Sequence, residues 1–428
     1  MPLLKYLLIF LFFCQFSSCT VAQTRLYSST NKKAIKNYEK ALMCFNTINP
    51  VSGKGDLKGA EQYLKKAIGK DSSFHEAYSL YSNVALEKGD IENGIYYRKK
   101  MMEKNTNVPL VEYYFLAGMQ MATGDYRGCL RNARKYSESP LANKNALINI
   151  NRMIENCVFA LKALENKSDL EPINLGDGVN SAMPEYFPSV TADDSTLLFT
   201  RMINDERAPL GTKQEDIFVS QRVDNEWSDG FSISNNINSS YNEGAPTFSS
   251  DGQYIIFVGC ETGAKGDYEY GYGRKGYGSC DLFYSQKIGD EWSSPVNLGP
   301  PINSRHWETQ PSFSSDGKTL YFVRGLTYDR QRRNPDDQDI FYSEITPDGW
   351  SKPKTLPKNI NTPFREESVQ IHPDGKTLYF SSNGHPGMGG LDIFMSRKQV
   401  DGSWSNPINL GSSEQVSINQ LIKINWFF

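Results

Sequence analysis

The sequence predicts a multidomain α-then-β chain, an α-solenoid of short helix pairs followed by an incomplete β-propeller with four visible blades. Two observations predict this order. A Gly-Asp pair recurs between apolar helical stretches at steps of 34 and 35 residues. Further along, a four-strand pattern recurs four times at steps of 53 to 65 residues. We therefore expect helical repeats over 31–166, sheet repeats over 170–411 and an atypical tail over 412–428.

The composition narrows the class of function. A chain of 428 residues has room for several domains, and a hydrophobic content of 39% is ordinary for a globular protein. The net charge is −3 and no run of Lys or Arg stands out, which argues against nucleic acid as a partner. The 4 His are scattered along the chain, so we expect no metal site and no cofactor.

Residues 1–22 have the features of an export signal. Lys5 precedes the apolar run 7–13, which is too short to span a bilayer and has the length of a signal-peptide core. Residues 16–19 resemble a lipobox, with an unusual Phe16, and would make Cys19 the lipidated first residue. The small residues of 20–22 suit signal peptidase I instead. Both alternatives predict export, to the periplasmic face of the outer membrane through a lipid anchor or to the periplasm.

Export also changes the interpretation of the cysteines, because disulfides persist in oxidising compartments. Cys260 and Cys280 flank one long loop and could staple it. Cys129 and Cys157 lie on neighbouring predicted helices and could also pair. For each pair the alternative is two buried free thiols, and no spacing is typical of a zinc site.

The helical repeats are defined by their turns. The Gly-Asp pairs at 55–56, 89–90 and 124–125 each lie between apolar stretches at helical spacing, and Pro140 closes the last unit. A Gly at the turn and small residues at the crossing would let two helices pack as an antiparallel pair. We expect most Tyr and Met side chains of these stretches to belong to the core.

These units resemble tetratricopeptide repeats (TPRs) over about 130 residues, with two good copies and one degenerate copy near Leu64. Tyr78 and Tyr113 stand where such repeats usually have a Trp, and the stretch 46–54 interrupts the first copy. The resemblance implies a TPR-like α-solenoid whose concave face docks peptides or proteins.

Each sheet repeat is expected to begin with a hairpin. Asp-Gly pairs at 251–252, 316–317 and 374–375 separate two short apolar runs, and such pairs suit tight turns. A third strand then begins at Asp216, and at the equivalent Asp-Ile-Phe or Asp-Leu-Phe triplets of the other repeats. We expect the repeated Asp to cap turns, with a calcium site as the alternative.

One Trp per repeat completes the pattern. Trp227, Trp292, Trp350 and Trp404 are expected to open a fourth strand and to pack inside the blade. With these features the four copies resemble the WD40-like repeats of bacterial periplasmic proteins of the TolB type, over residues 170–411.

The second repeat carries an aromatic insert between its second and third strands. Loops on rigid scaffolds often hold recognition residues. The sequence therefore predicts a partner-binding loop at Tyr268, Tyr270, Tyr272, Arg274 and Tyr277. The alternative is a disordered tip pinned by Cys260 and Cys280.

The strand count predicts an open propeller edge. Residues 171–176 match the outer-strand block 294–299, which makes five outer strands for four hairpin sets. The tail 412–428 has no Asp-Gly hairpin and is rich in apolar residues. We expect either a reading frame truncated or frameshifted relative to a longer ancestor, or a four-bladed ring with one redundant strand.

The order of signal, helical repeats and propeller resembles Bacteroidota-type envelope lipoproteins of the OmpA-like and type IX secretion accessory class. An OmpA-like peptidoglycan-binding domain usually follows in that class. None is visible here, so peptidoglycan is an expected partner only for a longer form. The resemblance implies a non-enzymatic scaffold that docks envelope proteins at the outer membrane or in the periplasm.

Two other functions are weighed against the scaffold. One is a propeller that senses a glycan or a peptide. The other is a propeller hydrolase or lyase, but the chain has no Gly-x-Ser-x-Gly nucleophile elbow, and we nominate no catalytic residue.

Overall fold

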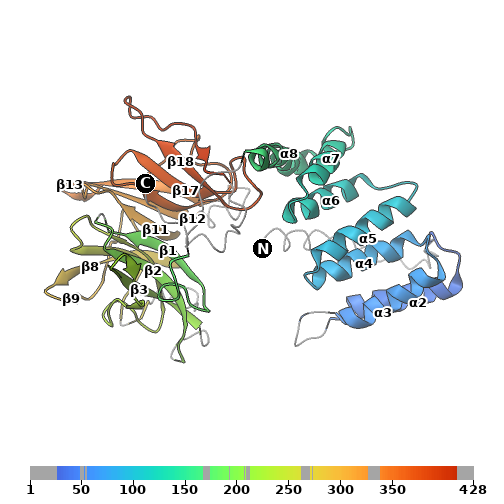
Figure 1. The fold of residues 1–428 in the computed structure, drawn as a ribbon, viewed down its shortest axis with the longest axis horizontal. Coiled ribbons are helices and arrows are strands. Elements are labelled where there is room, and N and C mark those ends of the chain that lie inside the picture. Colours follow the sequence, from blue (N-terminus) through green and yellow to red (C-terminus); the bar gives the residue numbers. More distant parts are fainter. Residues whose placement is uncertain are drawn as a thin grey trace. The chain divides into compact units, whose positions relative to one another are not determined.

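The computed structural model describes residues 27–48, 53, 55–166, 174–191, 193–206, 208, 213–261, 270–271, 273–325 and 338–411. The chain forms two compact units that divide between Leu161 and Lys162, a helical unit and a sheet unit (Figure 1). The predicted fold class is thereby confirmed. No helix in the described ranges is long and apolar enough to cross a membrane. The predicted signal segment with Cys19 and the tail 412–428 lie outside the described residues.

The described part of the helical unit contains seven helices, six of which form three hairpins. Their bounds are α2 (Lys32–Asn46), α3 (Leu57–Lys70), α4 (His75–Glu87), α5 (Ile91–Lys104), α6 (Leu110–Ala122), α7 (Tyr126–Ser137) and α8 (Lys144–Glu165). The hairpins α2–α3, α4–α5 and α6–α7 follow one another in chain order, and α8 comes after the third (Figure 1).

The recurring Gly-Asp pairs lie at the hairpin turns. Gly89 and Gly124 end α4 and α6 with positive φ angles of 81° and 76°, a conformation that suits glycine. The Asp of each pair caps the next helix. The carboxylate of Asp125, for example, accepts a hydrogen bond from the Gly128 main-chain N–H at 2.9 Å. One dipeptide thus stops one helix and starts the next.

The hairpins pack closely because glycines lie at the helix crossings. A Cβ atom on Gly94 would come within 2.7 Å of the Leu86 side chain. Tyr78, Tyr81 and Met121 are buried, as expected for core residues.

The sheet unit contains four antiparallel sheets, each a blade of consecutive strands. The first blade has β1 (Glu185–Val190), β2 (Thr196–Asn204), β3 (Lys213–Val223), β4 (Glu226–Trp227) and β5 (Phe231–Ser232). The second has β6 (Asn242–Phe248), β7 (Tyr254–Cys260), β8 (Cys280–Ile288), β9 (Glu291–Trp292) and β10 (Val296–Asn297). The third has β11 (Trp307–Phe313), β12 (Thr319–Gly325), β13 (Gln338–Thr346), β14 (Gly349–Trp350) and β15 (Lys354–Thr355). The fourth has β16 (Glu366–Ile371), β17 (Thr377–Ser382), β18 (Asp392–Arg397) and β19 (Ile408–Asn409).

In every blade the predicted hairpin joins the first strand, here called the inner strand, to the second. Gly252, Gly317 and Gly375 have φ angles of 66° to 67° at its turn, and Asp194 takes a similar conformation in the first blade. The prediction of four hairpins is confirmed.

The tryptophans lie earlier in the blade than predicted. Trp227, Trp292 and Trp350 are in the short strands β4, β9 and β14, which fold back on the end of the third strand. The outer strand is a separate element that begins only after them. Each Trp ends up against the blade, and Trp292 stacks on Phe248 with ring centroids 6.0 Å apart. These contacts fit the packing role that was expected for the tryptophans. The expectation that they open the outer strand was wrong.

Three hydrophobic clusters join successive blades. Leu198 and Ile217 of the first blade pack with Ile255 and Phe257 of the second, and similar clusters join the second blade to the third and the third to the fourth. A further cluster around Val179, Leu197 and Phe199 involves residues of the first blade and its preceding segment.

The segment before the first blade differs from its prediction. Of the outer strand expected at 171–176, residues 174–176 are described and are not in a strand. Leu175 instead packs against the cluster of the first blade.

Candidate functional site

The inner strands share one irregularity, a β-bulge at the same position in every blade. The residue in each bulge has a left-handed conformation, with φ angles of 52°, 46°, 52° and 54° for Phe187, Ala245, Gln310 and Ser368. None of the four is glycine, so each conformation costs roughly 1 kcal/mol or more and requires enforcement by its surroundings. Bulges of this kind redirect side chains, often next to binding sites.

These four bulges line one cavity. It has a volume of about 730 Å³ and is bordered by residues from all four inner strands. Two positions after each bulge residue, the cavity is lined by a small polar or amide side chain: Ser189, Thr247, Ser312 and Gln370. The cavity therefore presents four different bulge residues on a repeated backbone frame, and its size is in the range of ligand pockets.

Some of the polar side chains also hold neighbouring blades together. The Thr247 hydroxyl accepts a hydrogen bond from the Phe313 N–H at 3.4 Å, and the Ser312 hydroxyl accepts one from the Ile371 N–H at 3.0 Å. The side-chain carbonyl of Gln310 accepts from the Ser368 N–H at 2.5 Å. The cavity wall is thus a bonded part of the blade framework.

One side of the cavity is less covered than the others. Residues 186–190 of β1 are half-buried, whereas the equivalent positions of β6 and β11 are buried except for the last. On the fourth blade, Ile393 lines the cavity and is half-buried, whereas its equivalents Ile217 and Ile340 are fully buried. The cavity is therefore bordered by more accessible surfaces of the first and fourth blades.

A buried glutamate begins each inner strand and organises the segment before it. Glu185, Glu243, Glu308 and Glu366 are each less than 9% exposed. Each accepts hydrogen bonds from the N–H and hydroxyl groups of a Ser or Thr four residues earlier. For Glu243 these distances from Ser239 are 2.8 and 2.6 Å.

Three of the four glutamates pair with an arginine. Arg201 and Arg324 reach Glu185 and Glu308 from the strand position directly opposite, at 3.0 and 2.7 Å. In the second blade the opposite residue is Gly259, and Arg274 of the long insert pairs with Glu243 at 3.0 Å instead. All three arginines also donate to main-chain carbonyls of the preceding segment.

The fourth blade has no arginine in this place. Ser382 lies opposite Glu366 and donates to it at 2.7 Å, while the His385 ring contacts the Ile360 carbonyl at 2.9 Å. Burial raises the pKa of Glu243 and Glu308 to about 7 and that of Glu366 to about 8. Glu366 in the fold therefore takes up a proton at a higher pH than a free glutamate does.

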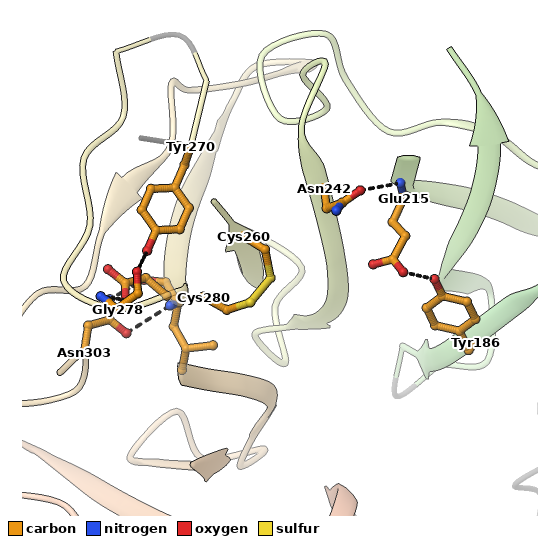
Figure 2. The surroundings of a disulfide bond; sticks show 10 residues. Tyr186, Glu215, Asn242, Cys260, Tyr270, Gly278, Cys280 and Asn303 are labelled. Carbon is orange, nitrogen blue, oxygen red and sulfur yellow. Dashed lines mark hydrogen bonds between the residues drawn. A yellow bond between two sulfur atoms is a disulfide. The ribbon is translucent and has the colours of Figure 1, made fainter. Parts of the chain in front are cut away.

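An asparagine completes the repeated frame. Asn238, Asn303 and Asn361 each bond both the N–H and the carbonyl of one third-strand residue of the preceding blade. For Asn303 and Leu282 the distances are 2.9 and 2.8 Å (Figure 2). The sequence analysis missed this frame, although its signal, Ile or Val followed by Asn, Ser or Thr and a Glu four residues later, recurs four times.

Three of the five residues of the predicted partner-binding loop are described, and they differ in exposure. Tyr268 and Tyr272 lie outside the described residues. Tyr270 is fully buried, packs against Phe283 and donates to the Gly278 carbonyl at 2.5 Å (Figure 2). Arg274 is buried in its pair with Glu243, and Tyr277 remains 46% exposed. Tyr270 and Arg274 therefore hold the loop on the blade, which corrects their predicted role at the surface.

The two predicted cysteine pairs differ in whether they form a disulfide. Cys260 and Cys280 form a disulfide across the base of the insert (Figure 2). Cys129 and Cys157 are free thiols, which leaves their expected disulfide unformed. Both are buried, and their sulfurs lie 3.9 and 3.7 Å from that of Met121. Both thiols belong to the hydrophobic cluster of the third hairpin and α8, so they are packing residues, and a hydrogen bond with Cys157 raises the pKa of Cys129.

Two of the repeated third-strand aspartates, Asp281 and Asp392, bond to nearby main chain, as expected for turn caps, whereas Asp216 accepts from the side-chain amide of Gln214 at 3.1 Å. Asp281 accepts from the N–H groups of Tyr277 and Gly278 at 2.7 and 3.2 Å, and Asp392 accepts from that of Met388 at 2.9 Å. In the described ranges, no group of three or more His, Cys, Asp or Glu residues is arranged to hold a metal ion.

The fold and the cavity together define a class: a helical-repeat protein with a four-bladed, propeller-like sheet unit. No family model and no curated protein matches the chain. Among solved structures it resembles a TolB from Agrobacterium tumefaciens at 14% identity and a TM-score of 0.31, over 54% of this chain and 64% of that one. This chain therefore spans less than two thirds of that protein.

Two enzymes give similar scores. They are an alpha-L-arabinofuranosidase from Lactobacillus brevis (12% identity, TM-score 0.35, 54% of this chain and 78% of that one) and an N-acetylgalactosamine deacetylase from F. plautii (12%, 0.36, 58% and 76%). The activities of these proteins are not transferred to this chain.

Proposed function

We propose that this protein is a non-enzymatic scaffold of the bacterial cell envelope, which binds protein partners through both its units. The cavity carries the proposal. A bonded frame of Asn, Ser or Thr, and Glu recurs in the blades, while the bulge residues that it presents differ in size and polarity. A constant frame with variable side chains is what recognition of an extended partner segment requires.

The cellular setting of the proposal comes from the sequence. The export signal and Cys19 support a lipoprotein at the periplasmic face of the outer membrane, with release into the periplasm as the alternative. The resemblance to Bacteroidota-type lipoproteins with TPR repeats supports a role in type IX secretion or in peptidoglycan-linked envelope assembly. Peptidoglycan itself would bind only through an additional OmpA-like domain.

A photo-crosslinking experiment tests the scaffold function. Ser368 is replaced by benzoylphenylalanine in the full chain, expressed in the source bacterium, because Phe187 shows that an aromatic residue fits the equivalent bulge. Val400, which is fully exposed and remote from the cavity lining, is the control position. We expect discrete crosslinked proteins from position 368 and none of the same species from position 400.

The second candidate is a glycan- or peptide-sensing propeller, which the cavity volume of about 730 Å³ favours. If position 368 gives no crosslinked protein while a small glycan or peptide raises the melting temperature of the purified chain, the scaffold proposal is wrong. The cavity is then a ligand pocket.

A further inference from the structure

The last helix of the helical unit lacks the partner that its predecessors have. Helices α2, α4 and α6 each pack against the helix that follows in the chain, α3, α5 and α7. Helix α8 packs one side, with Ile150, Met153 and Cys157, against the third hairpin. Within the described residues no helix follows it, and Val158 on another side is 49% exposed.

A groove runs between α7 and α8. It has a volume of about 540 Å³, and Leu130 of α7 and Leu161 of α8 supply its apolar surface. The remaining lining residues come from α7 and the turn after it: Arg127, Arg131, Arg134, Lys135 and Glu138. Arg127, Arg131 and Arg134 are spaced by four and three residues, so they form one row along the helix.

The four cations that line the groove, these three arginines and Lys135, have no acidic partner in the described part of the chain. All four are exposed, and the Lys135 ammonium lies 4.3 Å from the centre of the Tyr113 ring. The groove belongs to a basic region, because residues 31–166 contain 21 Lys and Arg against 14 Asp and Glu, a net charge of +7. Residues 167–428 contain 23 against 35, a net charge of −12.

We propose that this groove docks an acidic amphipathic helix of a partner protein. The occupant is a helix because α2, α4 and α6 each pack along the helix that follows them, whereas no helix follows α8 within the described residues. It is acidic because its carboxylates would meet the row of Arg127, Arg131 and Arg134, and amphipathic because Leu130 and Leu161 form an apolar floor. A concave, partly apolar site fits an inserted helix better than a flat membrane surface. The inference rests on the proposed scaffold function and adds the chemistry of one partner.

Binding of a defined peptide to the purified full chain tests this inference. The probe is a labelled helix of about 18 residues made of Glu, Leu and Ala, long enough to form an isolated helix in water. One matched peptide has Lys in place of Glu, and another has Ser in place of Leu. The protein variants are R131E/R134E and, as a control with the same change in charge on α2, K32E/K36E. All four positions are exposed, so circular dichroism should show intact folds.

We expect R131E/R134E to weaken binding of the Glu/Leu peptide about tenfold or more, and K32E/K36E to weaken it by less than about twofold. The Lys peptide should not bind. Equal losses of affinity in both variants would overturn the proposal that this groove docks an acidic helix. A Ser-containing peptide that binds as tightly as the Leu peptide would overturn it as well. So would binding of phosphatidylglycerol vesicles through Arg131 and Arg134 without binding of the peptide. Crosslinking from position 368 does not depend on these arginines, so the scaffold proposal and this inference fail separately.

Discussion

Arg274 shows that the arginine that pairs with the buried glutamate of a blade can come from different places in the chain. In the first and third blades the arginine that pairs with the buried glutamate lies on the opposite strand, at Arg201 and Arg324. The second blade has Gly259 at that position, and the insert provides Arg274. The contact recurs because a buried carboxylate without a counter-charge is costly.

Replacement of Arg274 by Ala should therefore destabilise the sheet unit. The variant leaves Glu243 buried without its cation, and we expect the free energy of unfolding to fall by about 2 kcal/mol near neutral pH. The neighbouring, exposed Lys275 is the matched control, and Lys275→Ala should change stability by less than about 0.5 kcal/mol. Urea unfolding measures both variants, and equal effects would contradict the role given to Arg274.

Glu366 makes stability depend on pH. Its pKa is raised from 4.5 to about 8, so the folded protein binds this proton more tightly than the unfolded chain does. The resulting stabilisation is fully present below pH 4.5 and is lost as the pH rises toward 8. Gln cannot ionise, so Glu366→Gln should gain stability relative to the unchanged protein over this range, on the order of a few kcal/mol.

The measurement for Glu366 is a series of urea unfolding curves at pH 5, 7 and 9. Glu226→Gln, an exposed change on the first blade, is the control and should leave the pH profile unaltered. A constant difference between Glu366→Gln and the unchanged protein at all three values would show that Glu366 does not titrate in this range.

At the scale of elements, the insert of the second blade is held at several points. The Cys260–Cys280 disulfide closes its base, Tyr270 packs into the blade, and Arg274 bonds across to the preceding segment. In the first blade, Tyr186 of β1 donates to Glu215 of β3, and the Glu215 N–H donates to Asn242 of the second blade at 3.0 Å (Figure 2). The described part of the insert thus belongs to the blade framework.

Loss of the disulfide should loosen this element. The two cysteines are 20 residues apart, and for a loop of this length we expect Cys260→Ser/Cys280→Ser to lower the free energy of unfolding by about 3 kcal/mol. Adding Arg274→Ala should cost less than in the unchanged protein, because both changes release the same loop. Calorimetric melting under non-reducing conditions measures the stability of both variants. If the losses of stability from the cysteine and Arg274 changes simply add, the disulfide and Arg274 do not hold the same loop.

At the scale of the whole molecule, the two units differ in charge as well as in structure. The helical part is basic and the sheet part acidic, although the chain as a whole has a net charge of only −3. An acidic molecule would therefore be attracted to the helical part and repelled by the sheet part.

The proposed membrane anchor gives a prediction for the complete protein. If Cys19 is the lipidated residue, Cys19→Ala should abolish the lipid-dependent increase in intact mass and move the protein from the membrane fraction to the soluble fraction. Mass spectrometry of the fractionated source bacterium checks this outcome. A product that begins at Gln23 in the unchanged protein would establish the alternative, cleavage by signal peptidase I.

The succession of helix pairs and blades can be predicted from local sequence signals alone. Gly89-Asp90 ends one helix and caps the next through contacts within a few residues, and Asp251-Gly252 makes its turn in the same local way. Such signals depend on neighbours in the chain, so they can be found without the fold. The recurring motif around Asn238 and Glu243 was equally available in the sequence, but its meaning depends on packing between blades.

The contacts between groups that are distant in the chain became known only from the folded structure. It buried Tyr270 and Arg274, which composition had suggested for the surface, and it left Cys129 and Cys157 as neighbouring thiols around Met121. It also turned an unremarked set of basic residues on α7 into one side of a groove. The physical reason is that the stability of a buried charge or thiol depends on the residues that pack against it. Those residues lie tens of positions away along the chain, so local sequence signals do not identify them.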